Sequence, residues 1–231
     1  AVSIIFISHN IWAVQITATL FAFLGMASSY FIARRVKFGG WLLRLVLAGI
    51  AISALFSSGL GILKYVADPL SELPEITFWL LGTLWAITWP QVLSVLPAVL
   101  SAFVVIYLMR WRLNLLSLND QTSFSLGAAP VRERLILLVA SVVATAALVS
   151  ISGMVSWVGL IIPHIARRIY GADARRLIPA SMLIGACFTL IADTLARTVF
   201  AGEIPLGILT SLLGAGIFLF LMIKRKGPLD S

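Results

Sequence analysis

Only one pair of residues in this sequence has the type and spacing expected of buried chemistry. Asp193 and Arg197 lie four residues apart, so one face of a helix would carry both side chains. The surrounding segment is apolar, and an unpaired charge there would be costly, so we expect an ion pair. The pair could contact a substrate or a proton, or it could be structural. The structural interpretation is favoured because each charge already has a partner.

The sequence lacks the motifs of nucleotide binding, metal binding and nucleophilic catalysis. No lysine precedes Ser or Thr, which excludes a P-loop, and neither His-Glu-x-x-His nor Gly-x-Ser-x-Gly occurs. His9 and His164 fall near opposite ends of the predicted helices, and Cys187 is the single cysteine. We therefore predict no catalytic residue and no metal site, and any ATP that drives this protein must bind another chain.

The composition is that of an integral membrane protein. Of the 231 residues, 61% are hydrophobic and only 11% are charged, whereas a soluble domain has about 25% charged residues. The net charge of +8 could indicate nucleic-acid binding. However, the basic residues cluster at the ends of apolar runs, as the positive-inside rule describes, so we expect contact with lipid and not with nucleic acid.

Seven apolar runs predict an all-α, polytopic transmembrane bundle that forms a single domain over residues 1–231. Helices are expected because lipid offers no hydrogen-bond partner to an open backbone. The fifth run is short and should cross with little tilt or begin below the membrane surface. Residues 1–8 resemble the end of an earlier run, so we expect a fragment that lacks its first spans. The runs cover 11–33, 42–64, 90–109, 135–152, 154–169, 177–199 and 205–223.

The charges predict the orientation of the bundle. If the runs alternate in direction, four clusters of basic residues share one side, whereas the opposite loops carry Asp68, Glu72, Glu75 and Glu203. The basic side should be cytoplasmic, which places the C-terminus in the cytoplasm of a multi-pass protein of the inner (plasma) membrane. The clusters are Arg34, Arg35, Lys37 and Arg44; Arg110, Arg112, Arg132 and Arg134; Arg167, Arg168, Arg175 and Arg176; and Lys224, Arg225 and Lys226.

One outer segment is apolar and aromatic but too short to span. Pro69 and Pro74 should interrupt the chain, and Ile76 to Trp85 should then form a short helix that lies at the outer surface or re-enters the membrane. Its tryptophans suit the interface between lipid and water. They could form an ordinary aromatic belt or a gate at the mouth of a pore.

The one long polar interval lies between the third and fourth runs. Residues 117–126 predict a short amphipathic helix that Gly127 ends, and Pro130 prevents its continuation into the next span. The connection exceeds the usual 2–8 residues between helices, so we interpret it as a docking site for a soluble partner rather than a simple connector. The predicted apolar face comprises Leu115, Leu118, Thr122 and either Ser125 or Leu126.

The chain resembles the permease subunits of ABC importers for iron-siderophores, haem and vitamin B12. The resemblance covers nearly the whole sequence and is densest from residue 150 onward. It rests on GMVSWVGLIIPHIARR at 153–168, GAD at 171–173, RLIPAS at 176–181, GA at 185–186, AD at 192–193, AR at 196–197 and EIPLGILT at 203–210, with FWLLG at 78–82 and LVLAGI at 45–50 upstream.

This resemblance implies about ten spans in a complete subunit. The implied partners are a second permease copy, two cytoplasmic ABC ATPases that hold ATP and magnesium, and a periplasmic or extracellular solute-binding protein; this chain would bind no cofactor. It also implies that residues 113–131 couple to the ATPase. The family pattern there, Gly-acid-x-x-Ala-x-x-Leu-Gly, is kept at Asp120 and Gly127 and altered at Asn119 and Ser123. The implied coupling residues are Leu118, Asn119, Asp120, Ser123, Ser125, Leu126 and Gly127.

The predicted function is that of a transport permease that imports a metal chelate by ATP-driven alternating access. An importer of an oxyanion such as molybdate is the alternative within the same architecture. An intramembrane enzyme would depend on Asp193 and Arg197, and a receptor-like scaffold would not need the long polar loop. Small residues suggest either helix packing or a pathway wall. The pathway candidates are Gly49, Ser53, Ser57, Phe78, Trp79, Gly82, Gly207, Thr210 and Gly214.

Overall fold

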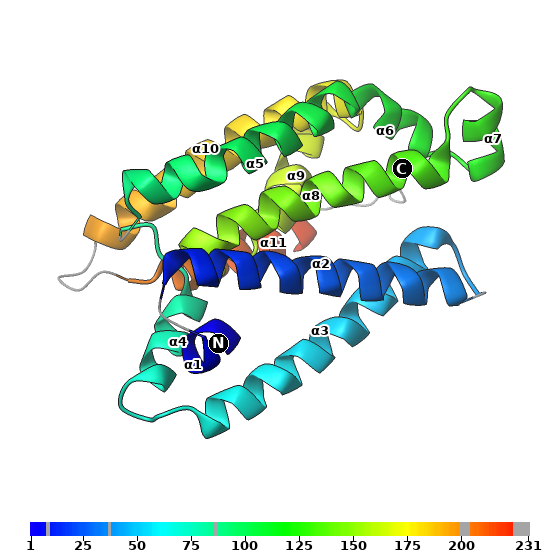
Figure 1. Ribbon diagram of the computed structural model, residues 1–231. Helices are drawn as coiled ribbons and strands as arrows, with labels where there is room; N and C mark the ends of the chain where they lie inside the picture. The colour runs from blue at the N-terminus through cyan, green and yellow to red at the C-terminus, as the bar shows by residue number, and fades with distance from the viewer. Residues whose placement is uncertain (8–9, 37, 86, 199–203, 224–231) are drawn as a thin grey trace.

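The computed structural model describes residues 1–7, 10–36, 38–85, 87–198 and 204–223 (Figure 1). Within these ranges the chain forms eleven helices and no strand, which confirms the predicted all-α fold. Five helices are long and apolar enough to cross a membrane. They are α2 (Ile11–Arg35), α3 (Trp41–Val66), α5 (Trp89–Leu108), α8 (Pro130–Ser152) and α10 (Ala174–Thr198).

Six further helices are shorter. The last of them, α11, is apolar and coincides with the seventh predicted run. The others include one helix at the outer turn and two in the polar loop. The six are α1 (Val2–Phe6), α4 (Glu72–Leu81), α6 (Arg110–Leu116), α7 (Asp120–Ser125), α9 (Val158–Tyr170) and α11 (Leu206–Ile223).

The fifth predicted span is a half-length helix in the structure. Helix α9 has 13 residues and is therefore about 20 Å long, less than the roughly 30 Å of a hydrocarbon core. The chain leaves the helical conformation at Gly153 and resumes it only after Trp157, whose φ of +69° is unusual for a bulky residue. Helix α9 is therefore too short to cross the core by itself.

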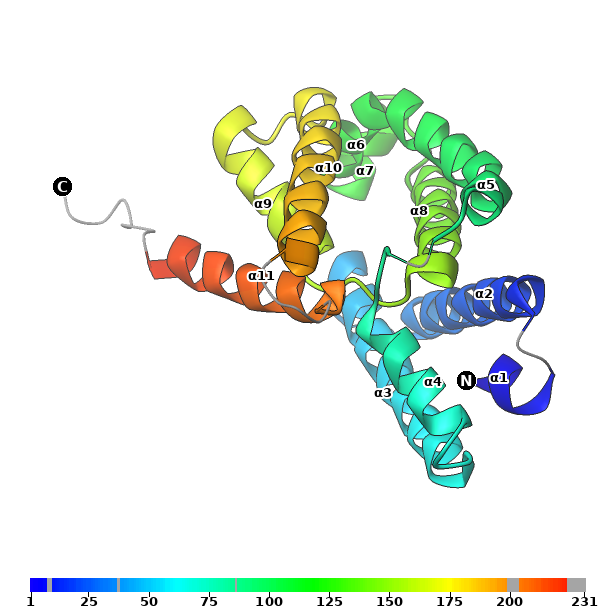
Figure 2. The same ribbon diagram turned by 90° about the vertical axis from the view of Figure 1, so that its left-hand side faces the viewer.

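The long helices form two groups. In the first group, α2 packs against α3 and α8, and α5 packs against α8; in the second, α10 packs against α9 and α11. Figure 2 shows α9, α10 and α11 on one side and α2, α5 and α8 on the other. The main contacts between the groups join α6 to α10 and α4 to α11. The groups are thus connected near the two ends of the bundle.

The connection between α4 and the break after α8 depends on glycine. Gly82 and Gly153 have φ values of +71° and +68°, which L-residues with side chains rarely adopt. A Cβ atom at Gly153 would lie 2.1 Å from the carbonyl oxygen of Trp79, and one at Gly82 would lie 2.4 Å from that of Met154. The two backbone segments therefore cross in direct contact.

The start of α11 completes this contact, which we call the glycine junction (Gly82, Gly153 and Gly207). A Cβ atom at Gly207 would lie 2.3 Å from the carbonyl oxygen of Leu81. The backbone N–H of Thr83 donates to the carbonyl of Ser152 at 2.8 Å beside the junction. Because glycines have no side chains, the backbone segments can approach closely, and their polar N–H and C=O groups can form hydrogen bonds with one another within the membrane protein.

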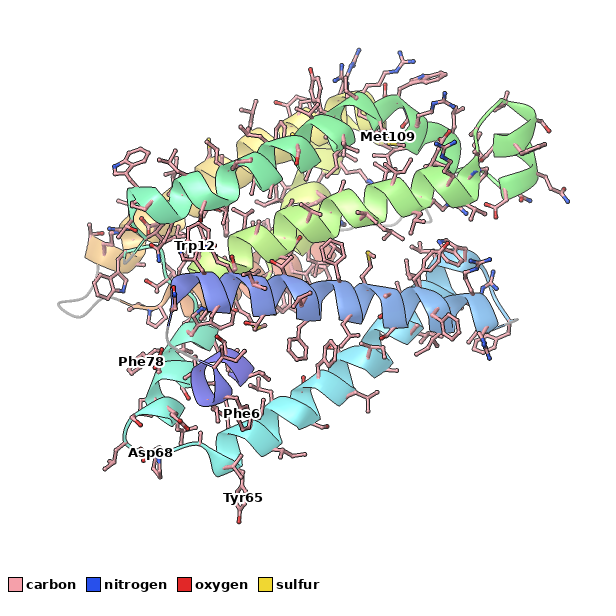
Figure 3. The ribbon with its side chains drawn as sticks, viewed as in Figure 1. Phe6, Trp12, Tyr65, Asp68, Phe78 and Met109 are labelled. Carbon is pink, nitrogen blue, oxygen red and sulfur yellow. The ribbon has the colours of Figure 1, made fainter. Side chains whose placement is uncertain are left out.

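The two ends of the bundle differ in charge as predicted. Asp68 and Met109 lie at opposite ends (Figure 3). At the Asp68 end, backbone hydrogen bonds from Leu70 and Ser71 lower the pKa of the Asp68 carboxyl below its ordinary value. Glu203 and the basic residues 224–226 lie outside the described residues.

The short outer helix begins earlier than the sequence suggested. Helix α4 starts at Glu72 and ends at Leu81, whereas the predicted segment ran from Ile76 to Trp85. Pro74 falls in its first turn and does not interrupt it, because the first N–H groups of a helix have no partner within the helix. The positive φ of Gly82 ends the helix before the expected boundary.

We predict that Gly207→Ala destabilises the protein and that Gly216→Ala, in the same helix, does not. The first substitution places a methyl group against the Leu81 carbonyl, whereas a Cβ atom at Gly216 would meet nothing within 4 Å. We expect Gly207→Ala to cost about 3 kcal/mol, or about 6–12 °C in the melting temperature measured by tryptophan fluorescence in detergent. Equal melting temperatures for the two variants would contradict the close contact at the junction.

Candidate functional site

The polar loop between α5 and α8 folds into two short helices, of which α7 lies beyond the end of α8 (Figure 1). The side chain of Asn119 caps the start of α7. Gly127, at φ +80°, follows its end, and the N–H groups of Gly127 and Ala128 donate to the carbonyls of Phe124 and Ser123 at 2.9 and 3.0 Å. The prediction that Gly127 ends this helix is confirmed.

The apolar face predicted for this segment does not form on one helix, because Leu115 lies in α6 and α7 begins only at Asp120. Ser123 is the fully buried residue of α7, and its Oγ lies 2.6 Å from the Leu115 carbonyl oxygen and 3.1 Å from that of Asn119, so the hydroxyl can donate to either. The helix has six residues, less than two turns, so tertiary contacts and not periodicity decide which face is buried. Of the residues assigned to that face, Leu118, Thr122, Ser125 and Leu126 are exposed.

The sequence analysis missed α6. The chain bends at Met109, where ψ is 1°, and then forms a new helix. Because this helix contains Arg110 and Arg112, its sequence had been interpreted as part of the polar loop. Leu113 and Leu116 lie three residues apart, and Leu116 is buried. The spacing of these two leucines could have indicated a helix with one face toward the protein. The arginines do not argue against such a helix, since their apolar stems can lie along its surface while the charges reach water.

One ion pair ties α6 to the start of α8. Arg112 Nη1 lies 3.1 Å from Glu133 Oε1 and also donates to the Gly127 carbonyl at 3.2 Å. The same Glu133 oxygen accepts the N–H of Ala129 at 3.2 Å. The Glu133 side chain is only 13% exposed, so this charge depends on its partners.

A second ion pair ties α7 to α8. Arg134 Nη2 lies 2.8 Å from Asp120 Oδ1 and donates to the Leu116 carbonyl at 3.1 Å. Asp120 is 59% exposed, and Arg134 is 20% exposed. Because α6, α7 and the start of α8 share these bonds, the projecting loop forms one unit.

The loop also contacts the turn between α9 and α10. Asn114 Nδ2 donates to Asp173 Oδ1 at 2.7 Å, and Asn114 Oδ1 accepts the N–H of Ala174 at 2.8 Å. The Arg175 guanidinium lies 5.6 Å from the centre of the Trp111 ring. Hydrogen bonds from the Arg175 N–H and then from Asn114 lower the pKa of Asp173, so its carboxylate stays charged at neutral pH. Two of the basic clusters therefore share one end of the bundle.

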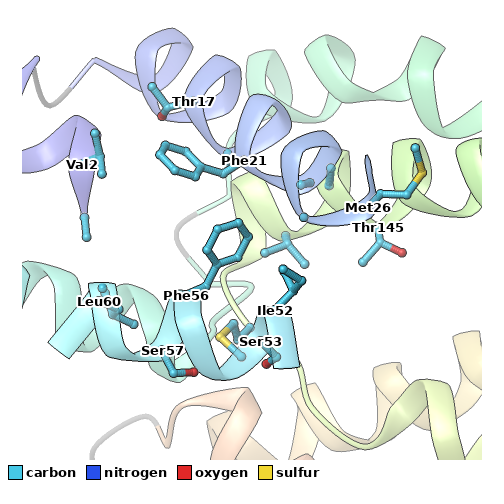
Figure 4. Close-up of a pocket in the computed structure, with 18 of the residues that line it drawn as sticks. Val2, Thr17, Phe21, Met26, Ile52, Ser53, Phe56, Ser57, Leu60 and Thr145 are labelled. Atoms are coloured by element: carbon cyan, nitrogen blue, oxygen red, sulfur yellow. The ribbon is translucent and has the colours of Figure 1, made fainter. Parts of the chain in front are cut away.

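Four of the nine pathway candidates line a large apolar cavity. This cavity, about 1110 Å³ in volume, lies between α2, α3 and α8, with α1 and α4 at one end (Figure 4). The rings of Phe21 and Phe56 meet edge to face in it, with their centres 6.2 Å apart. Phe78 does not line this cavity and is 68% exposed. The four lining candidates are Gly49, Ser53, Ser57 and Trp79.

The remaining pathway candidates lie at helix contacts. Gly82 and Gly207 belong to the glycine junction. A Cβ atom at Gly214 would lie 2.7 Å from Trp157 Cβ, and Thr210 is fully buried with its hydroxyl 3.3 Å from the Gly207 carbonyl. In this structure these four positions lie where helices pack closely, and none of them lines the cavity.

The intramembrane charges form the expected ion pair. Arg197 Nε and Nη2 lie 2.9 and 3.2 Å from the two carboxylate oxygens of Asp193. Both oxygens are bonded to one guanidinium, so the pair is satisfied within α10. Among the described residues, no three His, Cys, Asp or Glu side chains come together as a metal site.

The sequence of nearly the whole chain matches a known protein family. Residues 1–224 match the FecCD transport family. A probable iron chelatin transport system permease protein of Helicobacter pylori is 39% identical over 223 residues, which cover 96% of this chain and 68% of that protein. The hemin transport system permease protein HmuU of Yersinia pestis is 40% identical over 208 residues, covering 89% of this chain and 62% of that protein.

Two further similarities concern cargo and fold. The molybdate import system permease protein MolB of Haemophilus influenzae is 42% identical over 187 residues, covering 80% of this chain and 55% of that protein. A solved structure described as "an inward-facing conformation of a putative metal-chelate type ABC transporter" is 35% identical, with a TM-score of 0.90. That match covers 96% of this chain and 70% of the solved chain.

We predict that Arg112→Met lowers the stability of the loop by about 1–2 kcal/mol, a value reduced because Arg112 is 40% exposed. The loss should arise because Glu133 keeps a poorly solvated charge with one fewer partner. Adding Glu133→Gln should recover most of the loss, since a neutral amide can still accept from Ala129. Melting temperatures in detergent measure both effects. No recovery in the double variant would show that the contact of Arg112 with Gly127 matters more.

Proposed function

The chain belongs to the FecCD transport family, and we propose that it is the permease subunit of a binding-protein-dependent ABC importer of a metal chelate. The observation that carries this proposal is the similarity to the solved metal-chelate type transporter over 96% of this chain. An iron-siderophore, haem or a cobalamin is the proposed class of cargo. The names of the Helicobacter and Yersinia relatives support this class.

In this proposal the loop formed by α6 and α7 receives the movement of a partner ATPase. Three apolar side chains on it are exposed although they lie outside the apolar part of the bundle: Leu118 at 43%, Phe124 at 74% and Leu126 at 56%. Apolar side chains gathered on a polar projection are typical of a protein contact. Two ATPase subunits that hold ATP and magnesium, a second permease copy and a solute-binding protein are the proposed partners.

The proposed orientation follows from charge. The end that carries Arg112, Arg134 and Arg175 faces the cytoplasm, where the ATPases are, and the Asp68 end faces the solute-binding protein. The C-terminus then lies in the cytoplasm of the inner (plasma) membrane. ATP binding would move the loop and shift the permease between outward-facing and inward-facing states, which requires a few kcal/mol of differential binding.

The proposed cargo pathway uses the cavity between α2, α3 and α8. Gly49, Ser53 and Ser57 give its wall small side chains, and the rest of the lining is largely apolar. A bulky chelate with apolar surface suits such a wall. The molybdate relative makes an oxyanion the second candidate. Hydroxyl groups such as those of Ser53, Ser57 and Thr145 line the cavity and can donate to an oxyanion, but no lysine or arginine among the described lining residues offsets its charge.

We predict that Asp120→Lys and Gly127→Pro each uncouple ATP hydrolysis from uptake while the permease still inserts. The first replaces the 2.8 Å contact with Arg134 by repulsion. The second requires a negative φ where the structure has +80° and removes the N–H bonded to Phe124. Uptake per ATP hydrolysed, measured in proteoliposomes with the full-length permease and its partners, should fall about tenfold or more.

A charge exchange separates two explanations of that result. Asp120→Lys combined with Arg134→Glu restores the ion pair inside the loop but reverses the charge offered to the ATPase. Recovery of uptake would mean that Asp120 shapes the loop, and continued loss would mean that it contacts the ATPase. Normal uptake by Asp120→Lys and Gly127→Pro alone would contradict a coupling role for α7.

We predict that the reconstituted importer accumulates a chelate and not an oxyanion. With the full-length permease, its ATPase and its solute-binding protein in proteoliposomes, ATP should drive uptake of at least one of radiolabelled ferric hydroxamate, haem and cobalamin. Excess unlabelled molybdate should not compete. Uptake of labelled molybdate with no uptake of any chelate would favour the second candidate, and no ATP-dependent uptake of any of the four would contradict the importer function.

A further inference from the structure

The contact between α6 and α10 is more specific than ordinary helix packing. The first N–H groups of any helix lack partners inside that helix and must find them elsewhere. Asp173 serves α10 in the usual way: its Oδ1 accepts the N–H of Arg175 at 3.0 Å, and its carbonyl accepts the N–H of Leu177 at 2.9 Å. The N–H of Ala174 is left, and Asn114 of α6 accepts it at 2.8 Å.

Asn114 uses both ends of its amide at this corner. While Oδ1 accepts from Ala174, Nδ2 donates to Asp173 Oδ1 at 2.7 Å. Ala174 and Leu177 are buried, so the start of α10 is held against protein and is not a freely solvated end. One side chain of α6 therefore completes the N-terminal cap of a helix that belongs to the other group.

The turn that Asn114 contacts also connects α9 to α10. Helix α9 ends at Tyr170, and three residues, 171–173, connect it to α10. Gly171, at φ +81°, makes the reversal possible and bonds back to Arg167 at 2.9 Å. A force applied at Asp173 thus acts on both helices of this corner at once.

We propose that Asn114 is the joint through which movement of the α6–α7 loop reaches α9, α10 and α11. The proposal rests on the importer function given above and names a positioning residue for it. The loop moves as one unit because Arg112 and Arg134 tie its parts together. At the opposite end the glycine junction leaves no space for sliding, so a displacement of α6 turns the second group about that junction.

The test uses substitutions that alter the hydrogen bonds of the joint without changing the ATPase-facing surface of α7. Asn114→Ala removes both bonds, and Asn114→Asp sets a second carboxylate against Asp173. Co-purification with the ATPase measures whether each variant still assembles. Both should lose the stimulation of hydrolysis by the solute-binding protein and lower the uptake of radiolabelled ferric hydroxamate, haem or cobalamin per ATP by about tenfold.

Exchanging the two groups should restore transport. In Asn114→Asp combined with Asp173→Asn, the new carboxylate can accept from the Ala174 N–H and from Nδ2 of the new amide at position 173. The amide at 173 must turn so that its oxygen still accepts the N–H of Arg175, which Asp173 Oδ1 now accepts at 3.0 Å. Ser117→Ala is the matched control, because the exposed hydroxyl of Ser117 donates to the backbone carbonyl of Asn114 at 2.7 Å and not to either side chain of the joint. The exchange and the control should both transport like the wild type.

The outcomes distinguish the joint from the importer function. A merely structural role for Asn114 would lower melting temperature, hydrolysis and uptake together and leave uptake per ATP unchanged, which would overturn the joint. Wild-type uptake per ATP in Asn114→Ala, or no recovery in the exchange, would also overturn it while the importer function stands. If the wild-type assembly itself shows no ATP-dependent uptake, the importer function fails instead. Should Asn114→Ala fail to fold, the charge exchange decides.

Discussion

Polar backbone inside a membrane must be hydrogen-bonded by the protein itself, and this constraint shapes the structure. Most of the chain meets it with long helices. Between α8 and α9 the helix is broken for several residues, and there the protein brings α4 and α11 against the break. The three glycines of the junction allow this approach, and the bond from Thr83 to Ser152 satisfies backbone groups at the break. At the break itself Gly153 is buried against α4, whereas Met154 and Trp157 remain exposed.

The junction has a consequence at the other end of the bundle. Since two groups of helices are fixed together where side chains are smallest, relative movement between them is greatest at the far end. The basic loop lies at that far end, and its polar contacts cross from one group to the other through Asn114 and Asp173. In the mechanism proposed above, the glycine junction would act as the pivot, and the contact between Asn114 and Asp173 would transmit the displacement.

The sequence predicted the long helices well because each coincides with a long, mainly apolar run, and it predicted the end of α7 because glycine readily adopts the positive φ that follows a helix. It failed where tertiary contacts decide. Nothing local shows that Ser123 would be buried against the Leu115 carbonyl, or that Pro74 would fall within a helix. The small residues posed the same problem: Gly49 lines a cavity and Gly214 packs on Trp157, although both are glycines in apolar runs. Whether such a glycine lines a cavity or packs against another helix depends on where the neighbouring helices lie.

The altered residues of the coupling pattern can be understood from contacts within the loop. Where the family pattern has a small apolar residue, Ser123 has a hydroxyl that bonds a carbonyl of α6, so the change is compensated inside this chain. The retained acid, Asp120, is engaged by Arg134. In the coupling role proposed above, recognition of a partner would fall to the exposed apolar side chains, above all Phe124 and Leu126. The loop would then keep its shape through its ion pairs and offer its apolar tip to the partner.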